Sequence, residues 1–121
     1  MKAIELNSVQ QELDRFLNKD VYVHVETTNG AYSSHFGGQA FNVGAFIRNA
    51  RVRYSQAKIV AATGDSYRIG LKLEHGWIYV EGLTDWELYE QDQLLLAGHD
   101  TEGRLMVGLE ISETPFGQVN H

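Results

Sequence analysis

The pattern of hydrophobic and polar positions is most regular between residues 67 and 83. Apolar residues alternate with polar ones in two runs, and a period of two is typical of strands buried on one face. The apolar positions are Ile69, Leu71, Leu73, Ile78 and Val80. His75 and Gly76 separate the runs, and glycine accepts the positive φ that a two-residue hairpin turn requires. The stretch therefore predicts a β-hairpin.

The predicted turn determines which residues face each other across the hairpin. Leu71 should pair with Val80 and Lys72 with Tyr79, and facing residues lie on the same side of a sheet. One side is then apolar. The other side carries Lys72, Glu74, Trp77, Tyr79 and Glu81. We interpret this second side either as a solvated surface or as the lining of a site.

A single helix is predicted, over residues 8–19. Ser8 is a favourable N-cap, and Gln11 follows three residues later in a capping-box pattern. The helix has one apolar stripe. The stripe consists of Val9, Leu13, Phe16 and Leu17. We expect the helix to cover an open face or end of a sheet, with a role in binding a partner as the alternative.

Alternating patterns predict strands through most of the remaining chain. The strands cover residues 21–28, 41–47, 51–62, 86–89, 94–98 and 105–112. The alternation changes phase near Gln56, as a β-bulge would cause. One helix through residues 45–62 is the alternative, because that segment is rich in Ala, Arg and Gln. Residues 113–121 are expected to form a loosely held tail.

Chain length and the spacing of turns then indicate the fold class. A chain of 121 residues has the size of one domain. Short strands separated by glycine-containing turns favour a sandwich or a barrel. We predict a single all-β domain over residues 1–121, built from two packed, mostly antiparallel sheets or an irregular barrel, with one N-terminal helix.

Composition excludes several classes of function. The chain has no cysteine, which rules out disulfides and thiolate metal sites. Its net charge of −6 argues against general nucleic-acid binding, which needs basic surface. No apolar run approaches the ~20 residues of a membrane helix, and the N-terminal residues do not resemble a signal peptide. We expect a cytoplasmic protein that binds neither nucleic acid nor membranes.

Motifs for catalysis are not recognisable. His24 and Glu26 share one strand face and are the only possible metal ligands that local structure would hold together. A catalytic zinc site needs three protein ligands, so we expect no metal and no cofactor. A nucleophile elbow and a phosphate-binding loop are also missing. We assign no catalytic residue, and an enzyme or small-molecule-binding barrel with its site around His24 and Glu26 is the alternative.

Basic and aromatic residues provide the candidate binding site. Four of the ten basic residues fall within residues 48–58 and form a positive stripe. Such a stripe suits an anionic ligand or partner. The alternative is that these charges protect a sheet edge from pairing with other chains. Aromatic residues on outer strand faces suit a flat ligand, an oligomer interface or a second small core. The stripe is Arg48, Arg51, Arg53 and Lys58, and the candidate site comprises Tyr22, His24, Glu26, Arg48, Arg51, Arg53, Trp77 and Tyr79.

Five blocks of sequence, in order along nearly the whole chain, are similar to a known family. The blocks are VYVHVETTNGAYSSH at 21–35, FIRNARVRYSQAKI at 46–59, YRIGLKLEHGWIYVEGLT at 67–84, LLLAGH at 94–99 and LEISETPF at 109–116. They closely resemble the YojF-like family of Gram-positive bacteria. The resemblance implies a small, all-β cytoplasmic protein whose gene lies beside an LmbE-like sugar deacetylase of low-molecular-weight thiol synthesis. It supplies no catalytic or binding residues, and the zinc-binding His-Pro-Asp-Asp arrangement of such deacetylases is absent here.

The hypothesis that follows is an accessory protein without catalytic activity. Its expected partner is the neighbouring sugar deacetylase, or the anionic sugar that this enzyme produces. A homodimer is also expected, because one helix cannot cover aromatic residues on alternating strand faces. A buried cluster of Tyr22, His24, Glu26 and Arg51 or Arg53 in a deep pocket would favour the enzyme or barrel. A flat aromatic patch with those residues scattered would favour the binding protein.

Overall fold

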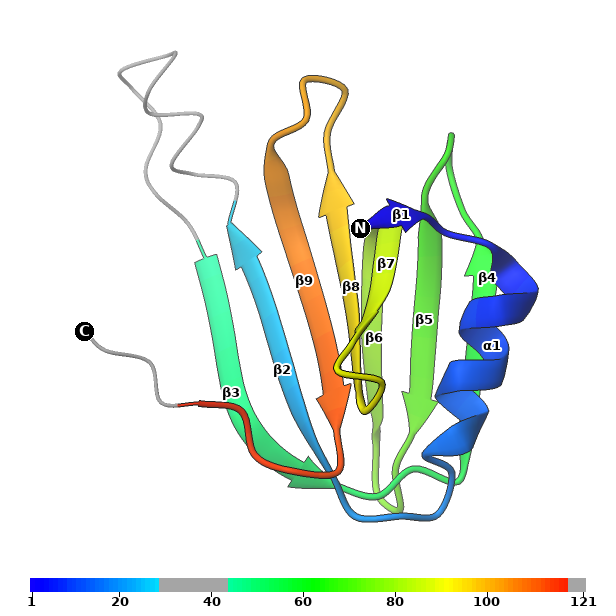
Figure 1. Ribbon diagram of the computed structural model, residues 1–121, viewed down its shortest axis with the longest axis vertical. Coiled ribbons are helices and arrows are strands. Elements are labelled where there is room, and N and C mark those ends of the chain that lie inside the picture. Colours follow the sequence, from blue (N-terminus) through cyan, green and yellow to red (C-terminus); the bar gives the residue numbers. More distant parts are fainter. Residues whose placement is uncertain (29–43, 118–121) are drawn as a thin grey trace.

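The computed structural model describes residues 1–28 and 44–117. Within them, one helix accompanies two antiparallel sheets that do not close into a barrel, as Figure 1 shows. The strand orders are β1-β7-β8-β9-β2-β3 and β4-β5-β6. The elements are β1 Lys2–Ala3, α1 Leu6–Arg15, β2 Val21–Thr28, β3 Gly44–Val52, β4 Gln56–Ala61, β5 Tyr67–Lys72, β6 Trp77–Leu83, β7 Asp85–Tyr89, β8 Gln93–His99 and β9 Leu105–Ser112. The all-β prediction with one N-terminal helix is confirmed.

The hydrophobic core lies between the inner faces of the two sheets, where β6 packs against β8 and β9. Alternate residues of each strand supply it, as the period-two pattern predicts. The fully buried residues include Val23, Leu71, Leu96, Leu109 and Ile111. Among the described residues, no helix combines the length and apolar character needed to span a bilayer.

The helix begins and ends earlier than the sequence predicts. Glu5 is the N-cap, and its side chain accepts a hydrogen bond of 2.6 Å from the Ser8 N–H. Ser8 therefore lies inside the first turn. At the other end Asn18 has a φ of 60°, and its N–H donates to the Tyr54 carbonyl at 2.8 Å. The helix itself ends at Arg15 with Phe16 as its C-cap, and the left-handed backbone at Asn18 then redirects the chain.

Helix α1 packs along β4, at the edge of the three-stranded sheet (Figure 1). Val9, Leu13 and Phe16 are buried, so the predicted apolar stripe is correct. Tyr54 is fully buried against it, and its hydroxyl donates to the Leu13 carbonyl at 2.6 Å. The helix therefore covers one side of the core.

Residues 44–61 form two strands in different sheets. β3 belongs to the six-stranded sheet and β4 to the three-stranded one, so the helical alternative for residues 45–62 is wrong. The phase change near Gln56 arises where the chain passes between sheets, and not from a bulge. A bulge occurs earlier, where Val23 pairs with Ala50 but Val25 pairs with Ile47. Residues 41–43 of the predicted strand lie outside the described residues.

The predicted hairpin register is wrong by two residues. Leu71 pairs with Ile78 and Lys72 with Trp77, so the loop is Leu73–Gly76 and contains four residues. Gly76 does not adopt the positive φ that a two-residue turn needs, and the Leu73 N–H donates to the Gly76 carbonyl instead. A shift of two keeps each strand residue on its predicted face, because side chains alternate with a period of two.

The segment after β9 is held more firmly than predicted. Phe116 is buried, and its backbone N–H and carbonyl both bond to the Asn49 side chain. Residues 113–117 therefore return beside β3 as an ordered segment (Figure 1). The prediction of a loose tail is wrong for these residues, and residues 118–121 lie outside the described part of the chain.

The chain crosses from one sheet to the other between β6 and β7. Gly82 has a φ of 83°, which favours glycine, and its carbonyl oxygen lies against Gly98 of β8. A Cβ added to Gly98 would lie 2.0 Å from that oxygen. The Thr84 N–H then donates to the Ala97 carbonyl, so β7 begins beside β8. Only glycine allows this contact.

We expect Gly98→Ala to destabilise the protein by about 3 kcal/mol or more, because backbone and not a flexible side chain occupies the space of the new methyl group. Urea unfolding measures the change. Gly76→Ala is the matched control, since a Cβ there meets nothing within 4 Å. It should change the free energy of unfolding by less than about 1 kcal/mol. Equal losses in the two variants would contradict the tight crossing.

Stability should also fall at alkaline pH. Burial raises the pKa of Tyr54 far above its ordinary value. An unfolded chain loses the tyrosine proton near pH 10, whereas the folded protein keeps it. The unfolded state then binds fewer protons, so the free energy of unfolding falls above about pH 10, by up to about 1.4 kcal/mol per pH unit. Urea unfolding from pH 8 to 11 tests this. Tyr54→Phe should flatten the dependence, and the exposed Tyr79→Phe should leave it unchanged.

Candidate functional site

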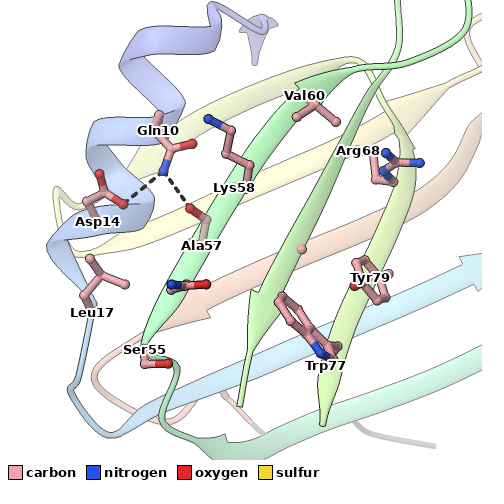
Figure 2. Close-up of a pocket in the computed structure, with 12 residues that line it drawn as sticks. Gln10, Asp14, Leu17, Ser55, Ala57, Lys58, Val60, Arg68, Trp77 and Tyr79 are labelled. Carbon is pink, nitrogen blue, oxygen red and sulfur yellow. Dashed lines mark hydrogen bonds between the residues drawn. The ribbon is translucent and has the colours of Figure 1, made fainter. Parts of the chain in front are cut away.

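A groove of about 700 Å³ crosses the outer face of the three-stranded sheet and is bordered by α1 (Figure 2). Its wall comes from the helix through Gln10, Asp14 and Leu17. Its floor and far side come from the three strands, whose outward residues are brought together by the alternation of side chains. The strand residues include Lys58, Val60, Arg68, Gly70, Trp77 and Tyr79.

Two aromatic rings form a platform in this groove. Trp77 and Tyr79 follow one another on the outer face of β6, with ring centroids 5.6 Å apart and planes inclined by 11°. They are 50% and 62% exposed. Figure 2 shows the two side chains next to each other. About half of the Trp77 side chain and more of the Tyr79 side chain are thus open to a flat ligand.

Gly70 supports the platform from the neighbouring strand. It pairs with Tyr79 across β5 and β6, and a Cβ at Gly70 would lie 3.0 Å from Tyr79 Cε1. The missing side chain therefore leaves room for one edge of the Tyr79 ring beside β5. A glycine inside a strand commonly marks such a close approach.

Charged side chains surround the platform unevenly. Arg68 Nη1 lies 3.2 Å from Glu81 Oε1, and Lys72 Nζ lies 5.9 Å from the centre of the Trp77 ring. Lys58 extends from β4 toward α1 (Figure 2). Within the described residues Lys58 has no ion-pair partner. The groove thus offers one unpaired ammonium group.

Gln10 fixes the wall of the groove to its floor. Its Nε2 donates to the Ala57 carbonyl and to Asp14 Oδ1, both at 2.9 Å, and its Oε1 accepts from the Ile59 N–H at 3.1 Å. The side-chain amide therefore takes the place of a neighbouring strand at the edge of β4. This bidentate contact positions the helix and keeps the groove open at a defined width.

A second cluster lies on the outer face of β2, β3 and β9. His24 is only 2% exposed, and its Nε2 lies 3.1 Å from Glu26 Oε1. Arg48 Nη1 lies 3.3 Å from His24 Nδ1, and the Phe46 ring contacts the imidazole edge-on at 4.9 Å. The predicted proximity of His24 and Glu26 is correct. Both imidazole nitrogens are occupied by internal contacts.

The bulge in β3 directs Arg48 into this cluster. Asn49 has a φ of 57°, which adds the extra residue opposite β2 and turns Arg48 toward His24. Arg48 Nε and Nη2 also donate to the Gly117 carbonyl at 3.1 and 2.7 Å. The guanidinium is therefore used to hold the C-terminal segment.

The remaining arginines of the predicted stripe contact an acidic residue. Arg51 and Arg53 donate to the two oxygens of Asp20 at 2.7 and 3.1 Å. These hydrogen bonds, the one from Arg51 first, lower the pKa of Asp20. Tyr22 pairs with Arg51 across β2 and β3. Both arginines are more than half exposed.

The structure therefore divides the predicted site. Tyr22, His24, Glu26, Arg48 and Arg51 follow one face of the six-stranded sheet, whereas Trp77 and Tyr79 lie on the three-stranded sheet with Lys58. Sequence reasoning missed Arg68 and Gly70, although the same alternation assigns both to the outer face. Gln10 gave no signal, because its partners lie 47 and 49 residues away. Among the described residues, no group of three His, Asp or Glu side chains could hold a metal ion.

Comparisons with known proteins agree with this architecture. Residues 3–116 match the family described as protein of unknown function (DUF1806). The chain belongs to this family. It is 50% identical over 116 residues to the uncharacterised protein YojF of Bacillus subtilis (strain 168), covering 96% of this chain and 98% of that protein. The crystal structure of Bacillus subtilis YojF matches with a TM-score of 0.79 and 46% identity over 97% of each chain.

The platform gives a direct prediction. Gly70→Ala should displace the Tyr79 ring and alter the near-ultraviolet circular dichroism of the Trp77–Tyr79 pair, because the new methyl group would contact two ring carbons. The free energy of unfolding should change by less than about 1 kcal/mol, since an exposed ring can move. In a Tyr79→Ala background the same change should leave the spectrum unaltered. An effect of equal size in that background would contradict the contact.

Proposed function

We propose that this chain is a non-catalytic binding protein whose groove takes a sugar ring that carries an anionic group. The observation that supports it most is that the exposed Trp77–Tyr79 pair and the unpaired Lys58 line the same groove. Aromatic faces contact the apolar face of a flat ligand, and a nearby cation selects for negative charge. The occupant therefore needs both a flat apolar face and an anionic group.

The walls of the groove suit a ligand with many hydroxyl groups. Asp14, Ser55 and Gln56 contribute polar atoms around an apolar floor that includes Ala57 and Val60. Ligand sites in proteins commonly combine apolar contact area with a few polar groups that orient the ligand. A sugar presents both kinds of surface. The groove is partly open to solvent, which fits a protein that carries or presents a ligand.

A catalytic role at the second cluster is less well supported. His24 is buried, and Glu26 and Arg48 occupy its two ring nitrogens. A general base needs a free nitrogen within reach of the substrate. We therefore favour the accessory function implied by the family resemblance, in which the sugar is the product of the LmbE-like sugar deacetylase.

Calorimetric titration tests the proposal with glucuronate as the anionic probe and glucose as its uncharged match. Glucuronate should bind more tightly than glucose. Trp77→Ala should weaken binding of both about fivefold, because a well-packed aromatic contact contributes about 1 kcal/mol. Lys58→Ala should weaken the binding of glucuronate about threefold and leave the binding of glucose unchanged.

The matched control is the double variant Arg51→Ala with Arg53→Ala, which removes two cations outside the groove and should leave glucuronate binding unchanged. A separate titration uses the purified LmbE-like deacetylase. If the deacetylase gives a heat of binding and neither sugar does, the chain binds a protein partner and not a sugar. No heat with any of the three at millimolar sugar and high micromolar protein would refute the proposal.

A further inference from the structure

The C-terminal segment is attached to β3 by two neighbouring side chains. Asn49 acts like a short strand: its Nδ2 donates to the Phe116 carbonyl at 3.0 Å and its Oδ1 accepts from the Phe116 N–H at 2.8 Å. Arg48 adds two hydrogen bonds to the Gly117 carbonyl and lies 5.3 Å from the centre of the Phe116 ring. The bulge presents both residues to the same segment.

The protonation state of His24 determines one of the contacts of Arg48. A guanidinium can only donate hydrogen bonds, so His24 Nδ1 is the acceptor in the 3.3 Å contact with Arg48 Nη1. The proton of the neutral imidazole is then on Nε2, which donates to Glu26 Oε1. This arrangement requires that His24 carries a single proton.

Charged groups reach His24 from each strand around it. Glu26 lies on β2, Arg48 on β3, and Glu110 is the partner of His24 on β9, with its Oε1 3.9 Å from Arg48 Nη1. Tyr22 lies on the same face of β2, and the rings of Phe46 and Phe116 are uncharged. The three charged groups sum to −1, so a second proton on His24 neutralises the cluster.

We propose that His24 is a proton-sensitive latch for the C-terminal segment. A second proton on the imidazole occupies Nδ1, which until then accepted a hydrogen bond from Arg48. The Nδ1–H group and the Arg48 Nη1–H group are then both donors, and they repel each other. Because the guanidinium is planar and rigid, displacing Nη1 also moves Nε and Nη2. Glu110 is the nearest alternative partner for Arg48. The Gly117 carbonyl then loses its two hydrogen bonds from Arg48, and the segment that contains Phe116 separates from the adjoining edge of β3.

Hydrogen exchange followed by NMR tests this latch on the wild-type chain at pH 7.5 and 5.5, where histidine side chains change charge. The probe is the protection factor of the Phe116 amide, corrected for intrinsic exchange and divided by that of the core Leu109 amide. We expect the ratio to fall at least about tenfold at pH 5.5, the effect of losing hydrogen bonds to a charged group. The Arg48 Nε–H signal should broaden in parallel.

Three variants separate the latch from a general effect of acid. His24→Gln cannot take up a proton, so its ratio should be the same at both pH values. His75→Gln, in the exposed hairpin loop, should behave like the wild type. Arg48→Lys keeps the charge but lacks the planar fork, so its ratio should be low at both pH values.

Nitrogen-15 spectra of the wild-type imidazole provide a readout that does not depend on any variant. At pH 7.5 they should show Nδ1 of His24 unprotonated and Nε2 protonated. A protonated Nδ1 together with a protected Phe116 amide would overturn the latch. So would a protection ratio that is equal at the two pH values in the wild type, or one that still falls tenfold in His24→Gln.

Discussion

The arrangement of the two sheets depends on the contact between the Gly82 carbonyl and Gly98. Here the chain leaves β6 and enters β7 after one intervening residue, and no side chain fits between the two backbones. Because this corner is tight, β6 lies directly over β8 and β9. That placement buries Val80 and Leu83 in the core, and it leaves Trp77 and Tyr79 on the outer side of the same strand. The core and the candidate groove are thus the two faces of one constrained strand.

Helix α1 covers the opposite edge of the three-stranded sheet. An unprotected edge strand exposes backbone groups that can pair with other chains. Gln10 bonds to β4 through both ends of its amide, and Tyr54 connects the sheet to the helix carbonyl of Leu13. The same contacts that protect the edge also build the wall of the groove. Stability and the shape of the candidate site therefore share residues on the helix.

Local pattern predicts a good part of this fold, because side-chain alternation depends only on neighbouring residues. It identifies the all-β class, the buried faces and the outward position of the aromatic pair. The alternation does not determine the hairpin register, since a shift of two residues leaves every side chain on the same face. The register depends on the turn geometry alone. The helix start was predicted at Ser8 because serine is a preferred N-cap and glutamate is not, yet the Glu5 side chain accepts the hydrogen bond from the Ser8 N–H. The bulge at Asn49 depends on partners in β2 and in the C-terminal segment that no local pattern contains.

The candidate site was the harder part to predict, because a cluster of charges in sequence does not say which charges find partners in the fold. Arg51 and Arg53 bond to Asp20, thirty-one and thirty-three residues away, and Arg48 bonds to the backbone of Gly117. These contacts connect the arginines to other parts of the fold, although Arg51 and Arg53 remain more than half exposed. Lys58, the last residue of the same stripe, lies in the other sheet and lines the same groove as the aromatic pair. The pairing that distinguishes these arginines from Lys58 is long-range in sequence, so it is visible only in three dimensions.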